Sequence, residues 1–207
     1  MESLVAALHV PGASVWLVVS YLLGSIPFGL LIALGLGKTD VRTKGSGNIG
    51  ATNVARVVGK KLGAFTLLLD GLKGAAPVLL VDVALEIPPE SGSLLASLSG
   101  LMALIGHCFP VWLRFHGGKG VATGAGFFVA HLPLEAGIGL AAFALVYAVS
   151  RTVSLASLLA GLVAVVTVAV RGPHDVSLAP VGVMFLIMVL RHTSNIKRLL
   201  RKEELKV

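Results

Sequence analysis

Two glycine-rich segments of this chain carry residues suited to binding an oxyanion. The first, GSGNIGATN at 45–53, lies between Lys44 and Arg56. The second, HGGKGVATGAG at 116–126, contains Lys119. Glycine lets successive backbone N–H groups crowd around one point, and a neighbouring cation adds positive charge. Because both segments also lie between long apolar stretches, they predict phosphate chemistry at a membrane surface.

The first segment surrounds its glycines with side chains that form hydrogen bonds. Its candidate binding residues are Gly45, Ser46, Gly47, Asn48, Gly50, Thr52 and Asn53, with Arg56 as a fixed cation. We expect Thr52 or Asn53 to cap a short helix, whose free N–H groups then point back into the loop. The segment alone leaves one alternative open, a flexible turn whose lysines are placed by membrane topology.

The second segment repeats this pattern around one lysine. Lys119 is flanked by Gly117, Gly118 and Gly120. An apolar helix is expected to begin at Val121, and a helix N-terminus after such a turn favours an anion. A nucleotide P-loop is excluded, because it requires glycine five places before the Gly–Lys pair, where this chain has Leu113.

A third polar motif, RHTSNIKRL at 191–199, follows the last apolar stretch. His192 and Asn195 are three residues apart and therefore share one face of a helix. We expect that face to look toward the two glycine segments. We interpret Arg191 and Arg198 as charges that extend to the lipid head groups.

Four further polar residues lie within apolar stretches. Asp70 and Lys73 are spaced to neutralise each other or to line a polar cavity. Ser154 and Ser157 lie one helical turn apart, and we include both among the candidate substrate-binding residues. Serines in such helices also bond to backbone carbonyls, so a structural role is the alternative.

No metal site and no cofactor is expected. The six histidines show no paired spacing of metal ligands. Cys108 is the single cysteine and adjoins His107 without a third member of a catalytic group. We interpret Cys108 as a small residue of the apolar core.

Composition places these motifs in a membrane protein. Of 207 residues, 56% are hydrophobic and 13% are charged, whereas a soluble domain has about a quarter charged residues. The net charge of +7 comes from short clusters between apolar runs. That arrangement is typical of a polytopic membrane protein rather than of a nucleic-acid partner. We expect one integral membrane domain, 1–207, that is all-α.

Seven transmembrane helices are predicted, with five as the alternative count. A span needs about 20 apolar residues, and the candidates are 14–36, 63–83, 94–113, 121–131, 135–150, 152–170 and 180–196. The stretch 121–150 is either one kinked helix or two short ones. Pro133, with the polar residues His131 and Glu135 beside it, favours a turn and two helices.

The charge distribution predicts the orientation. Cations lie on one set of connections: Lys38, Arg42, Lys44, Arg56, Lys60, Lys61, Arg114, Lys119, Arg151 and the tail from Arg191. Acids lie on the other: Glu2, Asp82, Glu86, Glu90, Glu135 and Asp175. The positive-inside rule then puts the N-terminus outside, and both glycine segments and the C-terminus in the cytoplasm.

Taken together, these motifs resemble the bacterial acyl-phosphate–dependent glycerol-3-phosphate acyltransferases, the PlsY family, over almost the whole chain. The resemblance rests on GSGNIGATN with Arg56, on GHCFPVWLRFHGGKGVAT, and on RHTSNIKRL with Glu204, in the family's order. GSIPFG at 24–29 and DGLKG at 70–74 also match. The family pattern ends in glycine, any residue and glutamate. Here Lys202 replaces that glycine, so the local turn and the structural role of Glu204 stay open.

The resemblance implies transfer of a fatty acyl group from acyl phosphate to the 1-hydroxyl of glycerol 3-phosphate. Lysophosphatidic acid and phosphate would be the products, in phospholipid synthesis at the bacterial inner membrane. It marks Ser46, Arg56, His192 and Asn195 as catalytic residues, and Lys119 with its glycines as the glycerol 3-phosphate site. Membrane lipid and these two substrates are the implied partners; the sequence does not indicate the oligomeric state, and a monomer is compatible with these partners.

Two questions remain at this stage. Either His192 takes the proton of the hydroxyl group, or an oxygen of the acyl phosphate does. The second is slightly favoured, because no acidic residue near His192 in the sequence is placed to orient its ring. The alternative function is a transporter for phosphate or an organophosphate, but the spans show no inverted repeat with paired broken helices.

Overall fold

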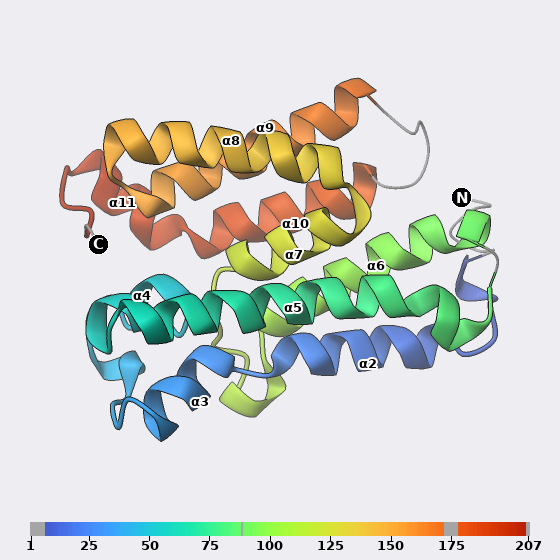
Figure 1. The fold of residues 1–207 in the computed structure, drawn as a ribbon, viewed down its shortest axis with the longest axis horizontal. Coiled ribbons are helices and arrows are strands. Elements are labelled where there is room, and N and C mark those ends of the chain that lie inside the picture. Colours follow the sequence, from blue (N-terminus) through green and yellow to red (C-terminus); the bar gives the residue numbers. More distant parts are fainter. Residues whose placement is uncertain (1–6, 88, 172–177, 206–207) are drawn as a thin grey trace.

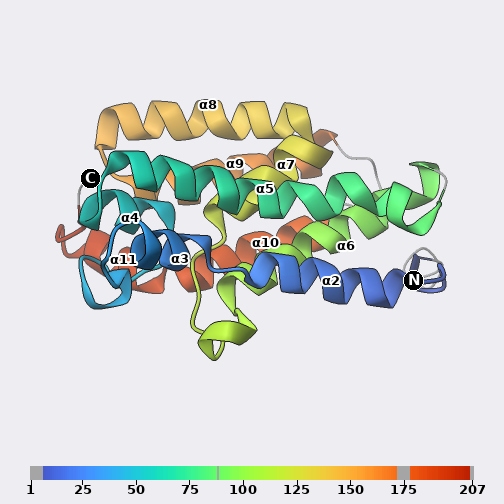
Figure 2. The same ribbon diagram turned by 60° about the horizontal axis from the view of Figure 1, so that its bottom comes forward.

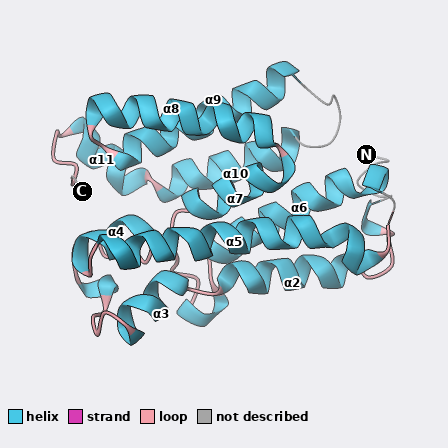
Figure 3. Cartoon of the chain, in the orientation of Figure 1, coloured by secondary structure: helices cyan, strands magenta, loops and turns pink. Residues whose placement is uncertain are grey.

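The computed structural model describes residues 7–87, 89–171 and 178–205, which form helices and loops with no strand (Figure 3). The prediction of an all-α protein is confirmed for these residues. The α-helices are α2 (Ala13–Ser25), α3 (Phe28–Gly35), α4 (Ala51–Val57), α5 (Lys60–Leu85), α6 (Pro89–Cys108), α7 (Val121–His131), α8 (Pro133–Ser150), α9 (Val153–Arg171), α10 (Leu178–Arg191) and α11 (Thr193–Leu200). Two short 3-10 helices are η1 (Val41–Thr43) and η2 (Val111–Leu113).

The long helices run along one axis in two groups (Figure 1). In one group α2, α5 and α6 pack on one another, and in the other α9 packs between α8 and α10. The short helix α7 packs against α5, α6 and α8 and so joins the groups. Figure 2 shows α4 and α11 at the same end of the molecule. The first glycine segment and the third polar motif therefore meet at that end.

Among the described residues, five helical stretches are long and apolar enough to cross a membrane, and α10 with α11 makes a sixth if this bent pair is one span. The predicted number of seven spans is not confirmed. Helix α7 has 11 residues and so a length of about 16 Å, roughly half of a bilayer core. The predicted turn after His131 is confirmed, because α7 ends there and α8 begins at Pro133. Proline suits a first helical position, which needs no N–H donor.

The first and last predicted spans are each broken, which the sequence prediction missed. The stretch 14–36 is divided into α2 and α3 at Ile26 and Pro27, because proline lacks an N–H group and disfavours helix at the preceding residue. The stretch 180–196 is divided into α10 and α11, which meet at 56° on either side of His192.

The buried pair Asp70 and Lys73 stabilises the first of these breaks. Lys73 Nζ lies 2.9 Å from Asp70 Oδ1, with both side chains 3% exposed, so the predicted neutralising pair is confirmed. Lys73 Nζ also donates to the Ile26 carbonyl at 2.7 Å. A carbonyl left without a helical partner thus gains a charged donor from α5. Cys108 is fully buried in the apolar core, as expected.

Small residues bring α7 against α5. A Cβ at Gly74 would overlap the Thr123 carbonyl, and a Cβ at Gly126 would overlap the Gly71 carbonyl. Small residues allow helix backbones in a membrane to approach this closely. Since α7 begins directly after Lys119, this contact fixes the second glycine segment relative to α5.

Candidate active site

The three polar motifs meet at one open cavity of about 1490 Å³. Ser46 and Arg56 come from the first motif, Lys119 from the second, and His192 and Asn195 from the third. Asn48, Gly50, Thr52, Asn53, Gly120, Ser154, Ser157, Arg198 and Glu204 also line it. A neighbouring polar pocket shares Ser46, Asn48, Lys119 and Arg198 with this cavity and adds Gly47, Gly117 and Arg191. Residues far apart in the sequence thus form one basic site.

Asn53 holds the first glycine segment in shape. Its buried side chain donates through Nδ2 to the carbonyls of Val41, Lys44 and Asn48 at 2.8–3.1 Å. Its Oδ1 accepts the Ser46 N–H at 2.8 Å. The sequence predicts Asn53 as a substrate ligand, but its amide is engaged within the loop, so we assign it a positioning role.

The predicted cap of the first motif is wrong. Helix α4 begins at Ala51 with Gly50 as its N-cap and without a side-chain cap bond, so Thr52 and Asn53 lie inside its first turn. Gly45 and Gly47 have φ values of 60° and 71°, a region that glycine enters without strain. The glycines therefore serve the path of the loop toward α4.

Arg191 holds the second glycine segment, and its prediction as a lipid-facing charge is wrong. It donates through Nε to the Gly118 carbonyl at 3.0 Å and through Nη2 to the Gly117 carbonyl at 2.6 Å. The N–H groups of Gly117 and Gly118 donate to the carbonyls of Cys108 and His107. These two amides are thus engaged by the backbone, and the prediction that they form an anion nest is wrong. The planar guanidinium group holds two donors in a fixed fork that matches these two neighbouring carbonyls, a geometry that the compact ammonium group of lysine does not provide.

For glycerol 3-phosphate, the substrate that the sequence resemblance implies, we expect Arg191→Lys to lower kcat/KM by about 30-fold, because losing one charged hydrogen bond costs about 2 kcal/mol and releases the turn before Lys119. Steady-state kinetics of the purified variant measure this. Lys197→Arg, a change on the neighbouring α11, serves as the matched control and keeps the parent value. A parent-like kcat/KM in Arg191→Lys would contradict the role of Arg191.

Glu204 connects α9 to α11, a structural role that the sequence left open. Its Oε1 accepts from Ser154 Oγ at 2.8 Å and from Asn195 Nδ2, and its Oε2 accepts from Arg198 Nε at 2.9 Å. Burial raises the pKa of Glu204, but hydrogen bonds from these three neighbours outweigh it and keep the pKa below its usual value. Arg198 therefore faces a carboxylate, not lipid head groups as we had predicted.

The turn before Glu204 survives the loss of the family's glycine. Lys202 has a φ of 59°, the left-handed conformation in which glycine is favoured and other residues are strained. The backbone at Lys202 thus keeps the shape that a glycine would give it, at a cost of about 1 kcal/mol.

Lys119 is the central cation of the site. Its Nζ donates to Asn195 Oδ1, which places it within the Asn195–Glu204 network. Burial, together with the nearby guanidinium groups, lowers the pKa of Lys119 from 10.5 to about 8, against the attraction of Glu204. The ammonium group is therefore charged below pH 8 and loses its proton above it.

This pKa predicts an alkaline limit to activity. The kcat/KM for the implied substrate, glycerol 3-phosphate, reports ionisations of the free enzyme, and we expect it to fall about tenfold per pH unit above pH 8. In the Lys119→Arg variant the guanidinium group keeps its proton throughout this range. We therefore expect no decrease of kcat/KM above pH 8 in this variant, even if its kcat/KM is lower than that of the parent at every pH. An identical alkaline limb in both proteins would contradict the assignment.

The ring of His192 is oriented by the backbone. His192 is 2% exposed, and its Nδ1 lies 2.8 Å from the Met188 carbonyl. Since a carbonyl only accepts hydrogen bonds, Nδ1 carries the proton and Nε2 has the lone pair. The Met188 carbonyl therefore orients the His192 ring. It takes the place of the acidic partner that the sequence lacks near His192.

The remaining candidates differ in how they are held. Arg56 lines the cavity, and its Nη2 donates to the Leu205 carbonyl at 3.4 Å. Ser157 donates to the Val153 carbonyl within its own helix at 2.8 Å, whereas Ser154 donates to Glu204. The described residues contain no cluster of three or more potential metal ligands.

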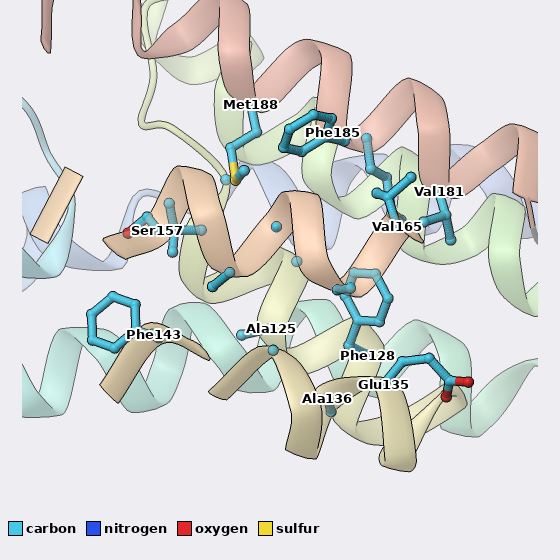
Figure 4. A pocket seen from close by; sticks show the side chains of 18 of the residues that line it. Ala125, Phe128, Glu135, Ala136, Phe143, Ser157, Val165, Val181, Phe185 and Met188 are labelled. Carbon is cyan, nitrogen blue, oxygen red and sulfur yellow. The ribbon is translucent and has the colours of Figure 1, made fainter. Parts of the chain in front are cut away.

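An apolar cavity of about 730 Å³ adjoins the basic site, between α7, α8, α9 and α10 (Figure 4). The two cavities share Gly120, Val121, Ala125, Leu140, Phe143 and Ser157. A polar site that opens directly into an apolar channel suits a substrate with a charged head and a hydrocarbon chain. No sequence pattern predicts this cavity, because its walls consist mainly of ordinary apolar helix residues.

Comparison with known proteins agrees with this chemistry. Residues 14–202 match the family model described as "Glycerol-3-phosphate acyltransferase". Proteins of that name from Myxococcus xanthus and Desulfotalea psychrophila are each 46% identical to this chain. The alignment with the Myxococcus protein covers 92% of this chain and 97% of that protein. The alignment with the Desulfotalea protein covers 90% of this chain and 93% of that protein. A crystal structure of PlsY, an integral membrane glycerol 3-phosphate acyltransferase in its glycerol 3-phosphate form, is 37% identical, with a TM-score of 0.87 over 95% of this chain and 96% of that one. A second structure of PlsY, in its lysophosphatidic acid form, has a TM-score of 0.85 over 94% of this chain and 95% of that one.

Proposed function

The chain belongs to the glycerol-3-phosphate acyltransferase family, and we propose that its acyl donor is an acyl phosphate. The reaction is then transfer of a fatty acyl group to the 1-hydroxyl of glycerol 3-phosphate, giving lysophosphatidic acid and inorganic phosphate. The observation that carries this proposal is the junction of two cavities. Arg56 and Lys119 line the polar one, and an apolar channel opens directly from it.

Two phosphate groups have to lie close together in this reaction, and the site has the charge to hold both. Lys119 and Arg198 line both polar pockets, with Arg56 in one and Arg191 in the other. We assign the phosphate of glycerol 3-phosphate to Lys119, and the phosphate of the donor to Arg56 with Ser46. Fixed cations stabilise neighbouring phosphates strongly where water is scarce.

The acyl transfer needs no covalent intermediate on the protein. The 1-hydroxyl oxygen attacks the acyl carbonyl carbon, a new ester bond forms, and the bond from that carbon to the phosphate oxygen breaks. Phosphate leaves with the electron pair. Alignment of the two substrates is worth up to about 7–11 kcal/mol, so positioning by the three motifs accounts for much of the rate.

We propose that His192 Nε2 accepts the proton of the attacking hydroxyl group. Because Nδ1 is bonded to the Met188 carbonyl, Nε2 keeps its lone pair and can accept that proton, whereas a neutral ring without a proton on Nε2 is a poor ligand for phosphate. The proton then passes to the leaving phosphate. Asn195 holds Lys119 and Glu204 in place beside this ring.

We further propose seven membrane passes, with α7 as a short pass, and a site that faces the cytoplasm of a bacterial cell. The positive-inside distribution supports this orientation. Arg56 of α4 and the cations Lys197 and Arg198 of α11 belong to helices at one end of the molecule, and α2 begins at the other end (Figure 1). Labelling of single cysteines at Lys44 and Glu86 from either side of the membrane tests the orientation.

A donor assay on purified protein in detergent tests the activity. The protein is incubated with labelled glycerol 3-phosphate and, separately, palmitoyl phosphate, palmitoyl-CoA or palmitoyl acyl carrier protein. We expect labelled lysophosphatidic acid, and equal phosphate release, with palmitoyl phosphate alone. Product from a thioester donor alone would overturn the proposed donor. A transporter of phosphate or an organophosphate would form no lipid and release no phosphate in this assay.

A further inference from the structure

The apolar cavity between α7, α8, α9 and α10 has one ionisable residue among its described lining residues, Glu135. Glu135 is 7% exposed, and its Oε1 accepts a hydrogen bond from Arg171 Nη1 at 3.0 Å. Arg171 itself is half exposed at the end of α9. A carboxylate beside an apolar cavity is costly unless it is paired, so this ion pair fixes where the apolar wall ends.

This pair lies at the end of the cavity that is remote from the basic site. Figure 4 shows Phe143 and Ser157 toward one end, and Phe128, Ala136 and Glu135 toward the other, with the Glu135 oxygens pointing outward. Phe143 and Ser157 also line the basic cavity, whereas Phe128 and Glu135 do not. Along α9 the lining extends from Ser157 to Val165, about 12 Å at 1.5 Å per residue.

We propose that Phe128 and the Glu135–Arg171 ion pair form an end stop for the fatty acyl chain and so set the longest chain that the enzyme transfers efficiently. The inference deepens the proposed function, because it assumes that the acyl chain occupies this cavity. A chain that reaches the stop has to displace the Phe128 ring or separate the ion pair. A shorter chain leaves part of the apolar wall without contact and loses binding energy.

Two substitutions at the stop are expected to change chain preference in opposite directions. Phe128→Ala lengthens the cavity by one or two methylene groups, and each buried methylene is worth about a fourfold change in affinity. The kcat/KM ratio of stearoyl over myristoyl donors is then expected to rise by about 4–15-fold. Ala136→Leu fills the same end of the cavity, where Ala136 is buried, and is expected to lower that ratio by a similar factor.

The test measures kcat/KM for lauroyl, myristoyl, palmitoyl and stearoyl donors with the parent enzyme and each variant. Phe65→Ala is the matched control, because Phe65 is 44% exposed on α5 and lies outside the cavity. The ratio of kcat/KM for stearoyl over myristoyl donors in Phe65→Ala is expected to equal that of the parent. Phe128→Leu, a milder truncation, provides the same measurement if Phe128→Ala does not fold.

Opposite shifts in the two variants support the end stop. Equal losses at every chain length, or shifts no larger than that of Phe65→Ala, overturn it. The series is run with whichever donor the parent enzyme uses in the donor assay. A preference for thioesters thus overturns the proposed donor, whereas unchanged ratios in active variants overturn the end stop alone.

Discussion

We expect Lys119→Ala to raise the KM for glycerol 3-phosphate by about 100-fold, or about 3 kcal/mol, with a much smaller fall in kcat at saturation. Removing one partner of a charged pair in a desolvated site costs about 2–5 kcal/mol. Lys119 lines both polar pockets, and burial has already lowered its pKa to about 8. Steady-state kinetics at varied glycerol 3-phosphate and saturating donor measure the effect.

Lys60→Ala is the control for this prediction, because Lys60 begins α5 on the exposed surface at the same end of the molecule. It removes one positive charge without touching the cavity lining, and its KM should stay within about twofold of the parent because surface charges contribute little. A similar KM in Lys119→Ala and Lys60→Ala would show that general positive charge, and not Lys119 itself, attracts the substrate.

For His192→Ala we expect kcat to fall by about 10²–10⁴-fold with little change in the KM for glycerol 3-phosphate, since general acid–base catalysis contributes about that factor. The ring is buried and its Nδ1 is bonded to the Met188 carbonyl. The other nitrogen is thus placed to receive a proton. Single-turnover measurements separate this chemical step from product release.

His9→Ala is the matched control, because His9 precedes α2 at the other end of the molecule from α11 and is exposed. It should behave as the parent. If His192→Ala instead raises the KM and leaves kcat intact, His192 binds a phosphate group, and the donor's own oxygen takes the hydroxyl proton.

The sequence predicted which motifs form the site, because its glycines, cations and polar side chains stand out against apolar helices. Ser46, Arg56, Lys119, His192 and Asn195 do line one cavity. It predicted less well what each polar group contacts. Asn53 and Arg191 have the chemistry of substrate ligands or surface charges, but they hold loops instead. Their partners are backbone carbonyl groups, and the residue types in a sequence do not indicate which carbonyls lie within reach.

Long-range partners explain the other differences. Glu204 bonds to Ser154, 50 residues away in the chain, and its role depends on a left-handed turn at Lys202 that residue type alone argues against. The break at Ile26 follows from Pro27 and was predictable from local rules, whereas the bend at His192 has no comparable local signal. The apolar channel arises only when four helices are assembled.

The break between α2 and α3 also bears on how the chain assembles in a bilayer. When the first hydrophobic segment enters the membrane, the Ile26 carbonyl finds no water there to bond with. Within its own segment it accepts from the Phe28 N–H. Its charged donor, Lys73, arrives with α5, and Lys73 enters the hydrocarbon region together with its counter-ion Asp70. Insertion of the second hydrophobic segment therefore adds the charged hydrogen bond that stabilises the break in the first.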